Sequence, residues 1–261
     1  MSPPRIGKRS DEVARLRELL RSREARDAAG RIVLEGKTLI ADAIARGVQV
    51  ERVYISADAT RAFESELGRY ADAGIEVVEL AIGAVDRIAT TRTPQPLLAE
   101  VISPFRESPT LSDRGLLIGL IGVSDPGNLG TIIRVAEAAG AAGIVHMSGC
   151  DSSAPKVVRA SAGSCFAVPI YEADRYSPDL LATGSRRVFG AAGHRGQSVA
   201  DCNWASATSV LFGSESHGIP AEVAEQLEEW VHIPMAGKVE SLNVAMSVAV
   251  VAFTAGMSRS A

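Results

Sequence analysis

The chain has 261 residues and a net charge of −4, with 46% hydrophobic and 22% charged residues, a composition typical of a globular protein with a large core. Its three cysteines lack the spacing of a disulfide framework or a zinc site, and its four histidines form no metal-binding pattern. The longest apolar run, at about 242–255, is shorter than the roughly 18 residues of a membrane span, and the chain opens without a signal-peptide pattern. We therefore expect a cytoplasmic protein that holds no metal.

Helices and strands are predicted to alternate over the first hundred residues. Ser10 can cap a helix that runs to about Ala29. Two more helices are expected at 37–46 and 60–73. Four short apolar runs resemble strands, at 31–35, 52–55, 76–80 and 97–102. This alternation predicts a small α/β domain.

The first predicted helix is rich in arginine. It contains Arg15, Arg17, Arg21, Arg23 and Arg26. Such a helix can line the phosphate backbone of a nucleic acid. It can equally be a solvated face with ion pairs inside the helix, and the sequence leaves both interpretations open.

A segment with two prolines, 103–109, marks the predicted boundary between a domain at 1–106 and a domain at 107–261. The second domain begins with the apolar run 116–123, which is typical of a parallel strand covered on both faces. A helix is expected at about 128–139. Further strands are expected at 143–146, 187–192, 209–212 and 230–233, and a last helix at 242–257.

The sequence does not match three known motifs for phosphate binding or catalysis. Gly36-Lys37-Thr38 lacks the glycine that a phosphate loop needs five positions earlier. The segment 122–130 does not fit the dinucleotide fingerprint. The segment 213–218 does not contain the nucleophile motif of a serine hydrolase in any register.

Three other segments of the second domain stand out together. The first, at 125–140, reads DPGNLGTIIRVAEAAG. The second, at 211–220, reads LFGSESHGIP, and the third, at 233–245, reads IPMAGKVESLNVA. A further run at 155–163, PKVVRASAG, lies between the first and the second.

On these segments the chain closely resembles the SpoU/TrmH-type RNA ribose 2′-O-methyltransferases of the SPOUT superfamily. The resemblance implies a C-terminal α/β domain with a deep trefoil knot. The first domain, on Leu34-Glu35-Gly36 followed by a helix, is similar to the L30e-like substrate-binding domain of that family. The implied activity is methylation of a ribose in structured RNA, ribosomal RNA first of all, with S-adenosylmethionine as cofactor. A tRNA 2′-O-methyltransferase and a catalytically silent RNA-binding module of the same fold are the alternatives.

The resemblance also implies site residues. The residues expected to bind the cofactor are Ala192, Gly193, Phe212, Gly213, Ser214, Glu215, Gly218, Ile233, Pro234, Met235, Ser241 and Leu242. Those expected to serve catalysis are Arg134, Asn128, Glu215, Ser241 and Asn243. Four of the catalytic candidates have a simpler alternative: an ion pair of Arg134 with Glu137, helix caps for Asn128 and Ser241, and a surface carboxylate for Glu215.

Arg134 is expected to orient the 2′-hydroxyl and to stabilise negative charge on its oxygen. A guanidinium has a reference pKa above about 12, so deprotonation by this group would need an unusual environment. One departure concerns Ser216, where relatives often have glycine, and a positive φ there would strain the loop.

The family usually forms homodimers, and the last helix could serve the interface. The residues considered for it are Val244, Val248, Val251 and Ala252, and the alternative is that they belong to the ordinary core.

Overall fold

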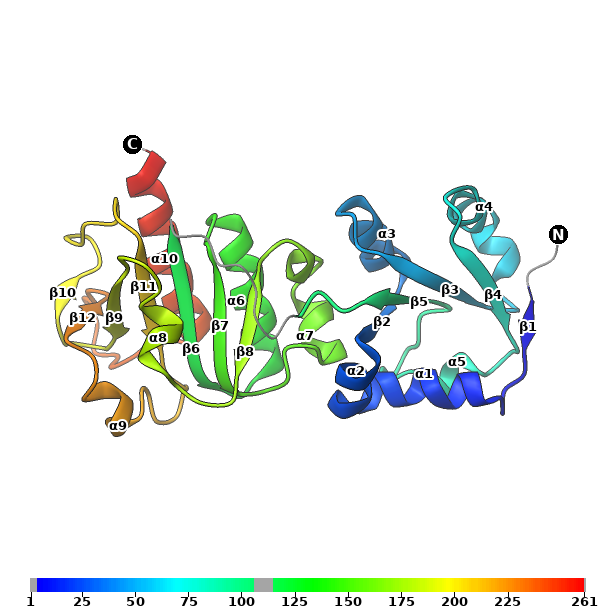
Figure 1. Ribbon diagram of the computed structural model, residues 1–261, viewed down its shortest axis with the longest axis horizontal. Coiled ribbons are helices and arrows are strands. Elements are labelled where there is room, and N and C mark those ends of the chain that lie inside the picture. Colours follow the sequence, from blue (N-terminus) through cyan, green and yellow to red (C-terminus); the bar gives the residue numbers. More distant parts are fainter. Residues whose placement is uncertain (1–3, 106–114, 261) are drawn as a thin grey trace. The chain divides into compact units, whose positions relative to one another are not determined.

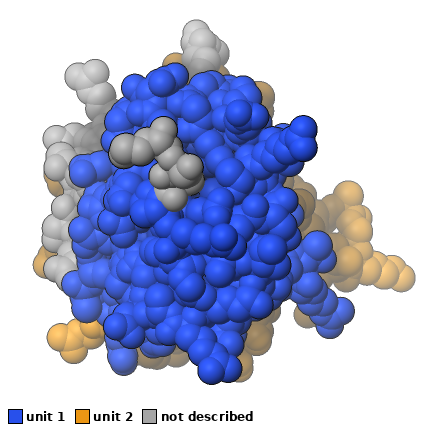
Figure 2. Space-filling model, turned by 90° about the vertical axis from the view of Figure 1, so that its right-hand side faces the viewer, with its two compact units in different colours: residues 1–104, 153–159 blue, residues 105–152, 160–261 orange. Residues whose placement is uncertain are grey.

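The computed structural model describes residues 4–105 and 115–260. The chain folds into two compact units, which are coloured separately in Figure 2. The first comprises Met1–Pro104 with Ser153–Arg159, and the second comprises Phe105–Ser152 with Ala160–Ala261. The predicted domain boundary at 106/107 lies outside the described residues. Each unit has its own sheet and its own hydrophobic core.

The first unit is built on a five-stranded mixed sheet with the order β1-β4-β3-β5-β2 (Figure 1). Its strands are β1 (Arg5–Ile6), β2 (Arg31–Glu35), β3 (Val50–Ser56), β4 (Glu76–Leu80) and β5 (Leu97–Ile102). β4 runs parallel to β1 and β3, whereas β5 is antiparallel to its neighbours β2 and β3. The four predicted strands are confirmed. The edge strand β1 was not predicted, because two residues show no periodicity.

Helices cover both faces of this sheet (Figure 1). They are α1 (Asp11–Arg21), α2 (Arg23–Ala29), α3 (Lys37–Ala45), the 3₁₀ helix η1 (Thr60–Phe63), α4 (Glu64–Asp72) and α5 (Val85–Ile88). The prediction of one helix from Ser10 to Ala29 is wrong. Ser22 has extended dihedral angles, φ −111° and ψ 124°, and its side chain caps α2. Ser10 caps α1 as predicted, because its hydroxyl accepts the backbone N–H of Val13.

Several arginines of α1 and α2 are engaged within the protein. Arg15 holds the buried carboxylate of Glu100 through two hydrogen bonds of 2.6 Å. Arg26 is itself buried, and Arg23 pairs with Asp27. These three side chains therefore fit the intramolecular interpretation of the arginine-rich segment rather than a phosphate-binding surface.

A short segment from the middle of the chain, Ser153–Arg159, belongs to the first unit. It carries the helix α7 (Pro155–Ala160). Ser153 at its start accepts a hydrogen bond of 2.8 Å from Arg26. Arg159 lies 3.7 Å from the buried carboxylate of Glu35, which also accepts the hydroxyl of Thr91 at 2.7 Å. Glu35, the central residue of the Leu34-Glu35-Gly36 motif, therefore joins β2 to the segment before β5 and to α7.

The second unit is built on a seven-stranded parallel sheet with the order β10-β12-β9-β11-β6-β7-β8. Its strands are β6 (Leu116–Val123), β7 (Gly143–Gly149), β8 (Ile170–Ala173), β9 (Arg187–Ala191), β10 (Gln197–Ser198), β11 (Thr208–Phe212) and β12 (Glu229–His232). β6 is buried along almost its whole length, as its continuous apolar run predicted. The other predicted strands are confirmed with ends shifted by a few residues, and β8 and β10 were not predicted.

Helices lie on both faces of this second sheet as well (Figure 1). They are α6 (Pro126–Ala138), the 3₁₀ helix η2 (Ser164–Phe166), α8 (Pro178–Leu181), α9 (Ala221–Ala224) and α10 (Val244–Ser260). α6 and α10 pack against each other, while Leu181 of α8 and Val223 of α9 belong to a separate core cluster with Leu117 and Leu211 of the sheet. None of the helices in the described part of the chain is long and apolar enough to cross a membrane.

Candidate active site

β6 and β11 are neighbours in the parallel sheet, and the chain leaves them toward opposite faces of the sheet. After β6 the chain enters α6, which packs with α10. After β11 the chain leads to α9. Val223 of α9 packs in the core cluster with Leu117 and Leu211, which contains no residue of α6. Such a switch point leaves a crevice at the carboxyl ends of the strands, where ligands of open α/β sheets bind. The first two sequence motifs follow these two strands, so the topology brings them together.

Three polar side chains form one hydrogen-bonded chain at this crevice. The amide nitrogen of Asn128 donates to Glu215 Oε1 at 2.5 Å, and the amide nitrogen of Asn243 donates to Asn128 Oδ1 at 3.1 Å. Asn243 Oδ1 accepts the backbone N–H of Ala245 at 2.9 Å. The structure thereby joins three of the residues predicted for catalysis, one from each sequence motif.

In this Glu215–Asn128–Asn243 network, the donor and the acceptor of each hydrogen bond follow from the groups at the two ends of the network. A backbone N–H can only donate, so the atom of Asn243 that faces Ala245 is an oxygen and its other amide atom is a donor. Glu215 Oε1 accepts the bond from Asn128, so Asn128 presents its nitrogen to Glu215 and its oxygen to Asn243. The two amides are consequently locked in one orientation each.

The side chains that cap α6 and α10 are not those of Asn128 and Ser241, for which the sequence allowed a capping role. Asp125 caps α6 by accepting the N–H of Asn128 at 2.9 Å, which leaves the Asn128 side chain free for Glu215. Asn243 caps α10, so the interpretation of Ser241 as a cap is wrong. Ser241 instead lines the cavity described next.

Arg134 lies on α6 two steps of three residues beyond Asn128, on the ridge that also carries Thr131. The opposite side of α6 buries Leu129, Ile132 and Ile133, so Arg134 points to solvent. Among the described residues, no ion pair or hydrogen bond engages its guanidinium, and the considered pair with Glu137 is not formed. The guanidinium is therefore available to an external substrate.

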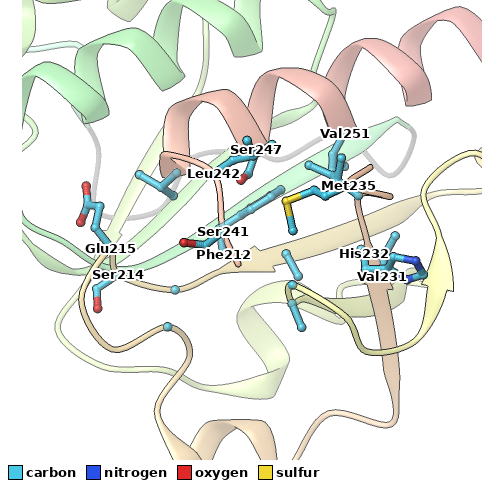
Figure 3. Close-up of a pocket in the computed structure, with 17 residues that line it drawn as sticks. Phe212, Ser214, Glu215, Val231, His232, Met235, Ser241, Leu242, Ser247 and Val251 are labelled. Atoms are coloured by element: carbon cyan, nitrogen blue, oxygen red, sulfur yellow. The ribbon is translucent and has the colours of Figure 1, made fainter. Parts of the chain in front are cut away.

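A cavity of about 240 Å³ opens among the loops that follow β9, β11 and β12, near the lower end of the size of small-molecule sites. Every residue predicted to bind the cofactor lines it except Pro234, which is exposed. Figure 3 shows Ser214 and Glu215 at one end of the cavity, Met235, Val231 and His232 at the other, and Ser247 and Val251 of α10 along its side.

Glycine is required at two positions of the cavity wall. A Cβ at Gly213 would lie 2.0 Å from the carbonyl carbon of Gly218, and a Cβ at Gly193 would lie 2.8 Å from the carbonyl oxygen of Glu240. The loops therefore approach one another backbone to backbone, and any larger residue would push them apart. Ser216 has no positive φ, so the expected strain at that position is absent.

Six lining residues were not predicted to bind the cofactor. They are Ala191, Val231, His232, Val244, Ser247 and Val251. Ala191, Val231 and His232 lie inside the predicted strands 187–192 and 230–233, near the carboxyl ends of β9 and β12. Ser247 and Val251 lie one and two turns after Asn243 on α10. The polar side chain of Ser247, within a largely apolar predicted helix, was the feature of the sequence that could have indicated that this face of α10 lines the cavity.

The residues considered for a dimer interface on α10 prove to be core. Val244, Val248, Val251 and Ala252 are at most 6% exposed. The apolar character of α10 extends around the helix, so the sequence could not tell which side faces inward.

The cysteines offer no reactive thiolate at this site. Cys150 follows β7, and burial raises the pKa of its thiol to about 11, with nearby carboxylates adding to the effect. Burial likewise raises the pKa of Cys202. Both thiols are therefore protonated near neutral pH. In the described ranges, no group of three or more potential ligand side chains is arranged to hold a metal ion.

Taken together, the fold and the site are typical of an enzyme, with a small-molecule cavity beside a polar cluster and an arginine open to an external substrate. Residues 115–253 match the model of the SpoU rRNA Methylase family, and residues 11–99 match that of the MRM3-like substrate binding domain. The chain belongs to the SpoU rRNA methylase family.

Relatives support this assignment over nearly the full chain. The 23S rRNA (guanosine(2553)-2′-O)-methyltransferase RlmP of Bacillus subtilis is 30% identical, with 90% of this chain and 92% of RlmP covered. The SpoU methyltransferase AviRb of Streptomyces viridochromogenes in complex with AdoMet is 25% identical with a TM-score of 0.82, covering 96% and 98% of the two chains. An AdoMet-bound rRNA methyltransferase of Sinorhizobium meliloti is 28% identical with a TM-score of 0.79, covering 96% of each chain.

Proposed function

We propose that this protein transfers a methyl group from S-adenosylmethionine to a ribose 2′-hydroxyl of structured RNA, first of all ribosomal RNA. The observation that carries the proposal is the hydrogen-bonded chain Glu215–Asn128–Asn243 at the cavity, with the unpaired Arg134 on the same helix as Asn128. The rRNA 2′-O-methyltransferase RlmP and the AdoMet complexes of two structural neighbours support the substrate class and the cofactor.

The cavity fits this cofactor by its chemistry. Backbone-lined walls at Gly193 and Gly213, which a Cβ would obstruct, suit the close approach of a flat adenine. Apolar side chains such as Met235 and Leu242 line it beside the hydroxyls of Ser214 and Ser241. When bound, the cofactor supplies an electrophilic methyl group.

The protein's own residues then have to position and polarise the hydroxyl. Arg134, as a permanent cation, favours negative charge developing on O2′ and donates hydrogen bonds that orient it. Asn128 and Asn243, each fixed in one amide orientation, would hold the carboxylate of Glu215 in place and position the ribose beside it. Glu215, the acceptor at the end of the chain, fixes the loop that lines the cavity. Such positioning is a large source of rate enhancement for a poor nucleophile.

The remaining finer assignments belong to the same proposal. Residues 1–106 would form the domain that binds RNA and residues 107–261 the methyltransferase domain. The second would carry the trefoil knot of the family, which is compatible with the order β12-β9-β11 in the sheet. The cytoplasm is the compartment that we propose, because ribosomal RNA is the substrate.

A homodimer is also part of the proposal, through a different face of α10 from the one first considered. Exposed apolar side chains recur at intervals of three or four residues on this helix. They are Met246 at 50%, Val250 at 38%, Phe253 at 43% and Met257 at 66%. A continuous apolar stripe of this kind is typical of a protein interface.

The test is transfer of labelled methyl groups from S-adenosylmethionine to unmodified ribosomal RNA and, separately, to tRNA. We expect label on ribosomal RNA, and a loss of about 100-fold or more in Arg134→Ala, the order of magnitude for removing a group that stabilises developing charge. Arg134→Lys keeps the charge and should retain part of the rate. Label on tRNA alone would overturn the ribosomal assignment. Cofactor and RNA binding without transfer to either RNA would identify a silent binding module.

A further inference from the structure

A second cavity of about 700 Å³ lies in the methyltransferase unit next to the first one. The loop after β11 separates them, because Ser214, Glu215 and Gly218 line both cavities. The second cavity extends from this loop over the carboxyl ends of β6 and β7 to the segment that follows β8. It therefore starts beside the polar cluster at which the ribose would react.

The charges around this cavity disfavour a phosphate. Asp174, Glu215 and Glu222 place three carboxylates in its lining, against the single guanidinium of Arg175. A phosphodiester inside would meet mostly like charge. Carboxylates are, in contrast, acceptors for the N–H groups on the edge of a nucleobase, as in the pairing of acidic side chains with the amino group of cytosine.

An aromatic ring supplies a stacking surface in the same cavity. Tyr176 is half-buried, with one side packed against the hydrophobic core of the sheet. Tyr176 also lines the cavity. Unstacked bases of RNA bind by stacking on aromatic side chains while their edges form hydrogen bonds.

The wall of the cavity contains a strained residue. Ser148 has φ +53°, and within the described residues only Ala162 shares a positive φ among non-glycine residues. Such a conformation costs energy that the surrounding structure must supply, and it is found preferentially at functional sites. The hydroxyl of Ser148 donates to the carbonyl oxygen of Met147 at 2.6 Å, which helps to stabilise this backbone at the cavity.

We propose that this second cavity binds a flipped nucleobase of the RNA substrate, stacked on Tyr176 and hydrogen-bonded through its N–H groups to the carboxylate of Glu222. The inference rests on the proposed function for the identity of the macromolecule. It adds a base-recognition site, outside the cofactor cavity, that selects which nucleotide of the RNA is presented. The carboxylates favour a base that carries donors on its exposed edge.

The experiment combines methyl transfer with a binding measurement that needs no turnover. Full-length protein loaded with S-adenosylhomocysteine is irradiated with labelled unmodified ribosomal RNA, and the crosslinked peptides are identified by mass spectrometry. We expect a crosslink at Tyr176. In parallel, KM for the RNA and Kd for S-adenosylmethionine are measured for Tyr176→Ala, Tyr176→Phe, Glu222→Gln and Glu225→Gln.

Tyr176→Ala should raise KM for the RNA about 10-fold, the order of magnitude for loss of one base stack, and Tyr176→Phe should stay near wild type. Glu222→Gln should raise KM several-fold. Glu225→Gln is its matched control, since Glu225 is exposed just after α9 and lies outside the lining. Kd for the cofactor should stay unchanged in all four variants, because none of these residues lines the first cavity.

The outcomes separate the two proposals. A crosslink at Tyr176 without methyl transfer by the wild type would overturn the proposed function and leave the base site standing. Methyl transfer with no crosslink in the cavity and wild-type KM in Tyr176→Ala would overturn the base site alone. A rise in KM that is equal in Glu222→Gln and Glu225→Gln would also overturn it, since the effect would then be one of general charge.

Discussion

The amide nitrogen of Asn243 donates to the amide oxygen of Asn128 at 3.1 Å, across 115 positions of the chain. The same Asn243 caps α10 with its oxygen. One side chain thus both starts the last helix and fixes the orientation of a residue of the first motif. Because its two polar atoms perform different tasks, substitutions can separate them.

Asn243→Asp should keep the fold and lower the activity. An aspartate still accepts the backbone N–H of Ala245, so α10 remains capped, but it has no N–H for Asn128. Asn243→Ala loses the cap as well and should unfold more easily by about 1 kcal/mol. We expect kcat to fall about 5-fold in both, the change that corresponds to a hydrogen bond worth about 1 kcal/mol. Thermal unfolding of Asn243→Asp is measured in parallel. If this variant keeps the wild-type kcat, the hydrogen bond between Asn243 and Asn128 does not contribute to catalysis.

Gly213→Ala should abolish cofactor binding. The new methyl group would lie 2.0 Å from the carbonyl carbon of Gly218, so the loop between them must open. Gly237→Ala is the matched control on another loop of the same motif set, because a Cβ there meets nothing within 4 Å. Calorimetric titration with S-adenosylmethionine checks both variants. Equal Kd values in the two would contradict the close approach of the loop backbones.

The stability of the first unit should fall in acid through Glu12. Hydrogen bonds from Arg15 lower the pKa of Glu12 to about 2, against the opposing effect of burial, and Tyr54 and Arg52 add to the lowering. The folded pKa lies below the unfolded value of about 4.5, so this contribution is complete above about pH 4.5 and is lost as the pH falls toward 2.

Glu12→Gln should therefore lower the free energy of unfolding by about 1 to 2 kcal/mol at pH 7, a value discounted for the partial exposure of the pair. The difference from wild type should shrink between pH 4.5 and pH 2. Urea unfolding at several pH values measures it, and Glu18→Gln, on the exposed side of α1, is the control. A difference that is constant with pH would point to a packing effect of the substitution instead.

Phe253→Asp should shift the protein from dimer to monomer. Phe253 lies in the exposed apolar stripe of α10, and a carboxylate there would have to be desolvated at the proposed interface. Ser258→Asp introduces the same charge on an exposed residue of the same helix away from the stripe and should leave the mass unchanged. Sedimentation velocity distinguishes the two. A wild-type monomer at micromolar concentration would contradict the dimer itself.

The order of helices and strands followed closely from the sequence where the periodicity was long. β6, a nearly continuous apolar run, and β5 were predicted with their ends unchanged. Short elements were not predicted, because elements of two to four residues, such as β10 and α9, cannot show a period. The break at Ser22 also escaped, because serine inside a helical pattern can face solvent as easily as it can cap a new helix.

By itself, the sequence determined the element types, the three motifs and the family, since these depend on local periodicity and on residues close together in the chain. Only the tertiary structure decided that Asn128, Glu215 and Asn243 meet, because strand order, not sequence distance, brings the ends of β6 and β11 together. It also decided which side of α10 is buried. An almost uniformly apolar helix carries no directional signal, so the packing of α6 and the sheet against it makes that choice.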